Sequence, residues 1–66
     1  MKITLNGSEI DVNSGMSLYE LLLFHGIKLE NIATEVNLKI IPKSEYKNFT
    51  INSGDNIEVI AFVGGG

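Results

Sequence analysis

Residues 1–26, MKITLNGSEIDVNSGMSLYELLLFHG, are the most informative part of the chain, because they predict a strand pair followed directly by a helix. In the first twelve residues, apolar side chains alternate with polar ones on both sides of Asn6-Gly7. This dipeptide is favoured in two-residue hairpin turns, where both residues need a positive φ. Residues 1–12 therefore predict a β-hairpin with one apolar and one polar face.

The helix is marked at both ends. Ser17 and Glu20 have the spacing of a capping box, and Met16 and Leu21 that of a hydrophobic staple. Gly26 is a typical C-terminal stop in the left-handed conformation. The sequence predicts a helix over residues 18–25 that lies across the apolar face of the hairpin. Its apolar face has helical spacing and comprises Leu18, Leu21, Leu22 and His25.

The second half of the chain predicts three further strands. Two short ones are expected at 32–37 and 39–41, with a helical turn at 43–46 opened by Pro42. A turn at 53–55 leads into a last strand at 56–63. The order β-β-α-β-β-β predicts an α+β fold of the β-grasp type, a mixed sheet of four to five strands packed on one helix. A right-handed crossover brings the last strand beside the first, parallel to it.

Composition limits the possible functions. The 66 residues carry a net charge of −3, with five lysines and no arginine, which argues against nucleic acid as a partner. There is no cysteine, so disulfides and thiolate metal sites are excluded. No apolar run approaches the roughly 20 residues that span a bilayer, and no signal peptide is evident. We expect one domain over residues 1–66, in the cytoplasm, with no membrane contact.

The chain ends in Val63, Gly64, Gly65 and Gly66, which come directly after the last strand without a linker. Glycine gains nothing from packing and loses the most entropy on ordering, so we expect residues 63–66 to form a flexible tail. Such a tail suits insertion of the Gly66 carboxylate into a narrow partner site. Gly65 would then be needed for access, because a side chain there would obstruct the channel.

The last strand offers a second candidate site. If Glu58 points outward, Ile60 and Phe62 share its face, while Ile57, Val59 and Ala61 point inward. Large apolar groups on an open sheet face suggest partner docking. The alternative is that they pack under a nearby loop. The partner-binding prediction thus comprises Ile60, Phe62, Val63, Gly64, Gly65 and Gly66.

The other polar candidates have simpler structural explanations. His25 is expected to interact with the C-terminal end of the helix, since no second base or nucleophile accompanies it. Asp55 is expected to be a turn residue and Glu58 a solvated strand residue. Lys43 and Tyr46 are expected to order the short helical turn.

Short motifs of one family are distributed over the whole length of the chain: Asn6-Gly7, Glu20-Leu21-Leu22, Glu35-Val36-Asn37, Ile41-Pro42-Lys43 with Tyr46, Gly54-Asp55, Ile57-Glu58-Val59 and Phe62-Val63-Gly64-Gly65-Gly66. In these motifs the chain resembles the ThiS family, bacterial sulfur carrier proteins of thiamine biosynthesis with a ubiquitin-like β-grasp fold.

This resemblance implies a carrier and not an enzyme. An E1-like adenylyltransferase would use ATP and Mg²⁺ to activate the Gly66 carboxylate, and a sulfur donor protein would convert it to a thiocarboxylate. Thiazole synthase would then take the sulfur. The chain itself would bind no cofactor and no metal. The terminal glycine run precedes no helix, so it cannot form a phosphate loop. The nucleotide site is therefore expected on the partner.

Three alternatives remain at this point. One is the small, sulfur-carrying subunit of molybdopterin synthase, although the short length of the chain and the segment from Pro42 to Tyr46 favour the thiamine branch. The second is a ubiquitin-like modifier joined to lysines, and the third is a plain interaction module.

Overall fold

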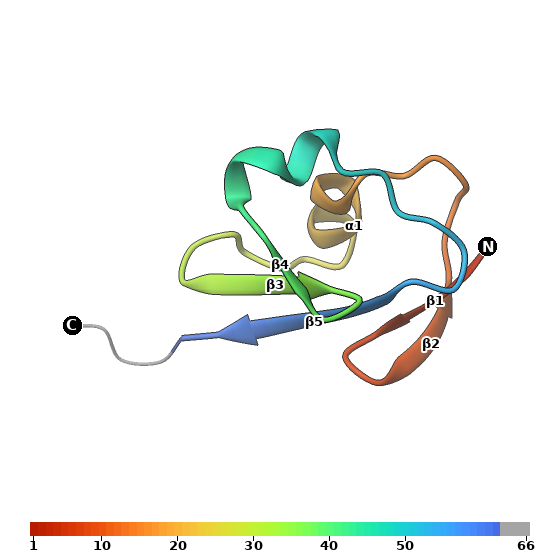
Figure 1. Ribbon diagram of the computed structural model, residues 1–66, viewed down its shortest axis with the longest axis horizontal. Coiled ribbons are helices and arrows are strands. Elements are labelled where there is room, and N and C mark those ends of the chain that lie inside the picture. The colour runs from red at the N-terminus through yellow and green to blue at the C-terminus, as the bar shows by residue number, and fades with distance from the viewer. Residues whose placement is uncertain (63–66) are drawn as a thin grey trace.

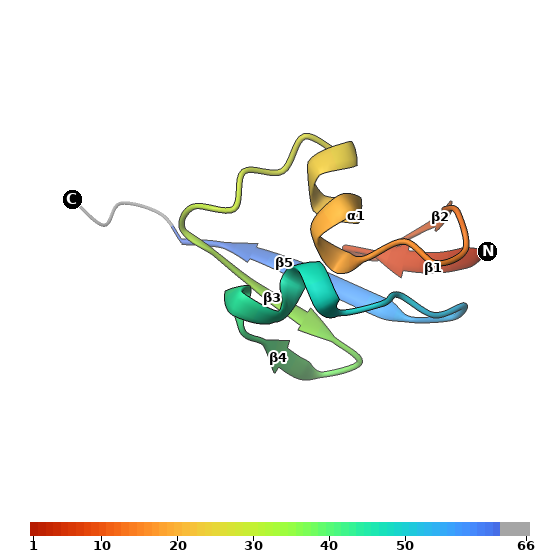
Figure 2. The same cartoon turned by 90° about the horizontal axis from the view of Figure 1, so that it is seen from above.

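The computed structural model describes residues 1–62, which form one five-stranded sheet with a single α-helix on one face (Figures 1 and 2). The elements are β1 (Lys2–Leu5), β2 (Ser8–Asp11), α1 (Leu18–Phe24), β3 (Ile32–Val36), β4 (Lys39–Ile41), the 3₁₀-helix η1 (Lys43–Asn48) and β5 (Asn56–Ala61). The strand order is β2-β1-β5-β3-β4, and only β1 and β5 are parallel. The predicted mixed sheet, with the last strand beside the first, is confirmed.

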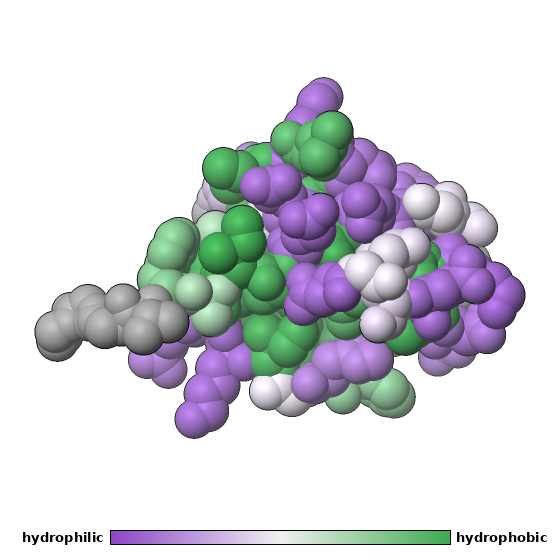
Figure 3. Space-filling view, turned by 90° about the horizontal axis from the view of Figure 1, so that it is seen from below, coloured by the Kyte–Doolittle hydropathy of each residue, from purple (hydrophilic) through white to green (hydrophobic). Residues whose placement is uncertain are grey.

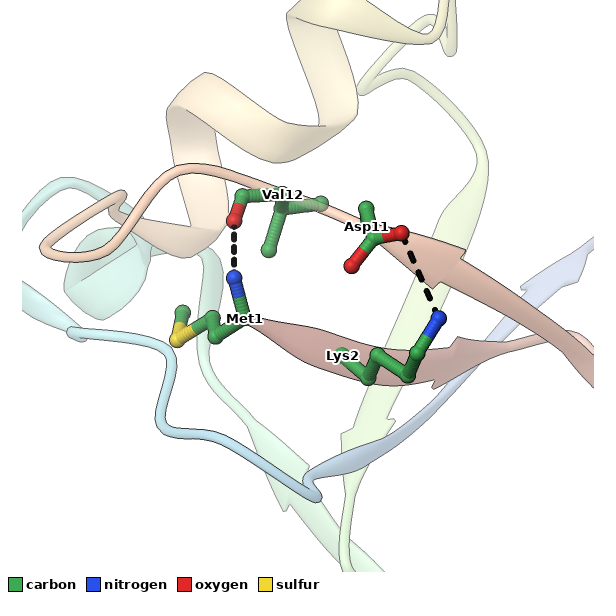
Figure 4. Close-up of polar contacts among 4 residues, drawn as sticks. All are labelled: Met1, Lys2, Asp11 and Val12. Atoms are coloured by element: carbon green, nitrogen blue, oxygen red, sulfur yellow. Dashed lines mark hydrogen bonds and ion pairs between the residues drawn. The ribbon is translucent and has the colours of Figure 1, made fainter.

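The β1–β2 hairpin has the predicted turn. Asn6 and Gly7 take φ values of 49° and 83°, as a two-residue turn of this type requires. At the open end of the hairpin, the Met1 ammonium group donates to the Val12 carbonyl at 2.7 Å (Figure 4). An ion pair between Lys2 and Asp11 spans 3.3 Å, but both side chains are largely exposed, so it adds little stability.

Helix α1 begins and ends by the predicted devices. Ser17 Oγ accepts from the Glu20 N–H at 3.1 Å, and Glu20 Oε1 accepts from the Ser17 N–H at 3.0 Å. At the other end, Gly26 has φ 69° and donates to the Leu23 carbonyl at 3.0 Å. His25 is the C-cap and is exposed, so its predicted place on the apolar face of the helix is wrong. The helix stops one residue earlier than predicted, and the chain turns before His25 can reach the core.

The capping box makes the stability of α1 dependent on pH. Hydrogen bonds from the Ser17 backbone and side chain lower the pKa of Glu20 below its usual 4.5. Because this pKa is lower in the folded state than in the unfolded state, the ionised Glu20 stabilises the fold at pH values above its usual pKa. This stabilisation is lost as the pH falls through the folded-state pKa. Glu20→Gln should therefore be less stable than the wild type at neutral pH, and the difference should shrink on acidification. Urea unfolding of both proteins between about pH 3 and about pH 7 measures this difference in stability over a range that includes the usual pKa of carboxylates. A difference in stability that does not change with pH would contradict the prediction.

The core lies between the sheet and α1 and is closed from the side by η1. Ten apolar side chains of residues 1–62 are buried: Ile3, Leu18, Leu21, Leu22, Ile32, Val36, Ile41, Tyr46, Ile51 and Ile57. The predicted helical turn at 43–46 is a longer 3₁₀-helix, and Tyr46 within it is almost fully buried. The Tyr46 hydroxyl donates to Thr34 Oγ1 at 3.0 Å, deep in the core. Tyr46 thus orders η1, as predicted, by anchoring it to β3.

Removing one partner of this buried pair should be costly. Tyr46→Phe leaves the fully buried Thr34 hydroxyl without its donor, which should lower the free energy of unfolding by about 1–3 kcal/mol. Replacing both groups, by Tyr46→Phe with Thr34→Val, should recover much of the loss. Denaturant unfolding of the two single variants and the double variant forms the cycle. Simple additivity of the two losses would show that the hydroxyls do not interact.

Candidate partner-binding strand

Strand β5 occupies the centre of the sheet. It pairs in parallel with β1 on one side and in antiparallel register with β3 on the other, from Val36↔Ile57 to Ile32↔Ala61. Its pairing with β1 is short, so β5 continues beyond the end of β1 (Figures 1 and 2). A central strand held on both flanks has a fixed direction, and this direction positions Phe62 at its end.

The start of β5 is held by polar side chains. Asp55 is 8% exposed, and its two carboxylate oxygens accept from Asn37 Nδ2 at 3.0 Å and from the Asn52 N–H at 2.8 Å. Asn37 Oδ1 in turn accepts from the Asn56 N–H at 2.9 Å. Asp55 is a turn residue as predicted, and it also joins the turn to the β3–β4 connection.

Asn37 was not identified as a structural residue from the sequence. It was predicted to end a strand over 32–37, but the strand ends at Val36. Asn37 and Leu38 instead take φ values of 52° and 71° and form the turn into β4. The only sequence signal was its place in the Glu35-Val36-Asn37 match.

The predicted outward face of β5 is observed. Ile57 is fully buried against the core, whereas Ile60 is 44% and Phe62 62% exposed. No loop of the described chain covers them, so the alternative of packing under a loop is wrong. Their role in docking stays a prediction.

Two predicted features of this strand need correction. Ala61 lies on the same side of the strand as Ile57 and Val59, as expected, but it is exposed and so does not belong to the core. Its β3 partner is Ile32, and β1 has already ended opposite Ile57, so no strand flanks Ala61 on the β1 side. The strand itself ends at Ala61 and not at 63, although the Phe62 N–H still donates to the Asn31 carbonyl at 2.7 Å.

The outward face around Ile60 is partly apolar. Cross-strand pairing places Ala33 opposite Ile60, Glu35 opposite Glu58, and Ile40 opposite Glu35. Ile40 is 70% exposed. Glu35 and Glu58 therefore separate Ile40 from Ile60, and we call only Ile60 and Phe62 the outer patch. Figure 3 views the molecule from the side opposite α1 and shows hydrophobic side chains gathered on part of this face, with hydrophilic ones around them. Exposed apolar groups collected in this way are typical of a protein-binding surface.

The other candidates show no catalytic arrangement in the part of the chain that is described. The ring of His25 lies edge-on to Phe24 with 5.6 Å between centroids, at the rim of a hollow of about 120 Å³. Among residues 1–62, no group of three or more His, Cys, Asp or Glu side chains could hold a metal ion. The same residues include no helix long and apolar enough to cross a membrane.

The glycine tail, residues 63–66, lies outside the described residues. The predictions for Val63, Gly64, Gly65 and Gly66, including the flexible tail and the reactive carboxylate, therefore stay predictions. What the structure places is the strand that leads to them.

The strand order and the capped helix on one face of the sheet define a ubiquitin-like β-grasp protein. The model of the ThiS family matches residues 2–66, and the chain belongs to this family. A crystal structure of the thiamine biosynthesis protein ThiS from Geobacter metallireducens has the same fold, with a TM-score of 0.88, 28% sequence identity and full coverage of both chains.

Two curated relatives are longer proteins. The chain is 41% identical over 66 residues to the thiazole synthase of Paramagnetospirillum magneticum and 36% identical to that of Magnetococcus marinus. Both alignments cover all of this chain, which spans 20% of the length of each relative.

Proposed function

We propose that this protein is a sulfur carrier for thiazole formation in thiamine biosynthesis and that the terminal carboxylate of Gly66 is its reactive group. A carboxylate is a poor electrophile and must first be coupled to a good leaving group. An E1-like adenylyltransferase would join it to AMP from ATP, with Mg²⁺, and release pyrophosphate. The terminal sulfur of a persulfide on a donor protein would then attack the acyl carbon, and AMP would leave with its electron pair. A thiol would reduce the S–S bond of the resulting acyl disulfide and so release the donor. The product is a thiocarboxylate on Gly66.

The observation that carries this proposal is the geometry of β5. The strand is fixed in the centre of the sheet, exposes Ile60 and Phe62 on its outward face, and leads directly to a run of three glycines. A rigid domain that presents apolar anchors beside a side-chain-free segment suits delivery of a chain end into another protein's active site. On this proposal the protein is a co-substrate and not an enzyme.

This chemistry implies the partners. The adenylyltransferase would supply the nucleotide site and bind ATP and Mg²⁺, so this chain needs no cofactor of its own. Thiazole synthase would accept the sulfur, a role supported by the two relatives of that name that contain a domain like this one. Because activation consumes ATP, we infer that the reaction takes place in the cytoplasm.

The thiamine branch is favoured over the molybdopterin branch. The family match and the similarity to a thiamine biosynthesis protein along the whole chain both point to it. A ubiquitin-like modifier would use the same activation step but would end in an isopeptide bond to lysine.

Intact-mass measurement separates these functions. The purified protein is incubated with the adenylyltransferase of the same organism, ATP, Mg²⁺ and a sulfur donor. A carrier gains the mass difference between sulfur and oxygen, and it loses this again when thiazole synthase and its substrates are added. A ladder of heavier species would identify a modifier, and an unchanged mass with unmodified Gly66 would contradict the proposal.

A further inference from the structure

The backbone of β5 directs its hydrogen-bonding groups alternately to its two sides. The Asn37 N–H donates to the Asn56 carbonyl at 2.8 Å, and the Phe62 N–H donates to the Asn31 carbonyl at 2.7 Å. Even-numbered residues of β5 therefore face β3. Since hydrogen-bonded and non-hydrogen-bonded pairs alternate along an antiparallel ladder, Val59 and Ala61 direct their backbone groups to the β1 side.

On that side, β1 pairs with β5 only at its beginning. The Asn6 N–H donates to the Ile57 carbonyl at 2.9 Å, and the Val59 N–H donates to the Asn6 side-chain oxygen at 2.7 Å. At Asn6 the chain turns away with a positive φ, and its side chain takes the place of the next ladder bond. Among residues 1–62, no group bonds to the Val59 carbonyl or to the N–H and carbonyl of Ala61.

This open edge lies where the sheet narrows to β5 and β3, next to residues of the outer patch. Proteins normally protect exposed edges with Pro, Lys, inward-pointing charges or a covering segment. The segment from Val59 to Phe62 contains no proline and no charged residue, and Ala61 is exposed. Two acceptors and one donor, flanked on one face by Ile60 and Phe62, form the pattern that a partner recognises by adding a strand.

We propose that this open edge of β5 pairs with an extended segment of thiazole synthase. The inference rests on the proposed function. Thiazole synthase is the chosen occupant because the two curated relatives combine a domain like this one with a thiazole synthase in one chain. The added strand would hydrogen-bond to the Val59 carbonyl and to both backbone groups of Ala61. Backbone pairing would hold the chain extended as it leaves the sheet and so aim the glycine tail into the active site.

Two chemically synthesised variants of the full chain test this pairing. In the first, Ala61 is N-methylated, which removes the donor and blocks approach of a strand. In the second, an ester replaces the amide between Ile60 and Ala61, which removes the donor without adding bulk. Titration calorimetry against the thiazole synthase of the same organism should show binding weakened more than about tenfold by the methyl group and about three- to tenfold by the ester.

The matched control is N-methylation of Glu9 on β2, the far edge of the same sheet. Val12 donates its N–H to the Met1 carbonyl at 2.8 Å, so by the same alternation Glu9 faces away from β1. This control should bind thiazole synthase as the wild type does. Because the altered N–H groups have no partner among residues 1–62, melting temperatures of both N-methyl variants should stay within a few degrees of the wild type.

The outcomes separate the pairing from the proposed function. Wild-type affinity of both Ala61 variants for thiazole synthase would overturn the proposed strand pairing. Weaker binding of the N-methyl variant alone would also overturn it, because it would indicate steric contact without a hydrogen bond. Loss of adenylation with normal binding to thiazole synthase would assign the edge to the activating partner and also overturns it. Failure of the wild-type protein to gain sulfur contradicts the proposed function, whatever the variants do.

Discussion

A chain lengthened by one alanine after Gly66 should lose adenylation and sulfur transfer altogether. The reacting carboxylate would move by one residue, or roughly 3.5 Å in an extended chain. Displacements of about 1 Å already cost on the order of a hundredfold in rate when a reacting group must be held in line. Deletion of Gly66 should have the same effect. Glycine contributes no side chain to a hydrophobic core, so the melting temperature should not move.

Pyrophosphate release with the adenylyltransferase and ATP measures the first step, and intact mass measures the sulfur gained. Gly64→Ala is the control, since it changes the glycine run but keeps the terminus in place and lies farther from the reacting atom. It should retain most of its activity. If the lengthened chain accepted sulfur at the wild-type rate, Gly66 would not be the reactive residue.

Phe62→Ala should weaken binding of the adenylyltransferase by about ten- to a hundredfold. Full burial of a large apolar side chain contributes about 1.5–3 kcal/mol, and Phe62 has most of its surface free to be buried by a partner. The fold should lose little, because Ile57 supplies the core contact of this strand. Titration calorimetry gives the affinity, and a melting curve on the same sample gives the stability.

Phe24→Ala is the matched control. Phe24 is the same residue type and is 80% exposed, but it lies at the end of α1, away from β5. The Phe24→Ala variant should bind the adenylyltransferase with an affinity within about twofold of the wild type. The corresponding change in binding free energy is well below the roughly 1.4 kcal/mol of a tenfold change. Equal losses in the two variants would show non-specific hydrophobic binding. Normal affinity of Phe62→Ala would place the docking surface elsewhere on the molecule.

Patterns within short stretches of the sequence were sufficient to predict the local elements and the fold class. The Asn6-Gly7 turn, the Ser17–Glu20 capping box and the Gly26 stop depend on residues a few positions apart, so their signals are complete in a short stretch. The alternation in β5 likewise identified Ile60 and Phe62 as outward-facing. Together with the order of elements, these patterns were sufficient to predict the β-grasp sheet.

How β5 is held, and where its edge is left open, depends on contacts between distant parts of the chain. Asn6 bonds to Val59 across 53 positions, and Asn37 bonds to Asp55 across 18. Ala61 alternates correctly yet is exposed, because β1 ends too early to flank it. Such contacts depend on the register between strands that are distant in sequence. Periodicity within one strand carries no information on where its neighbour stops, so the open edge became visible only in the assembled sheet.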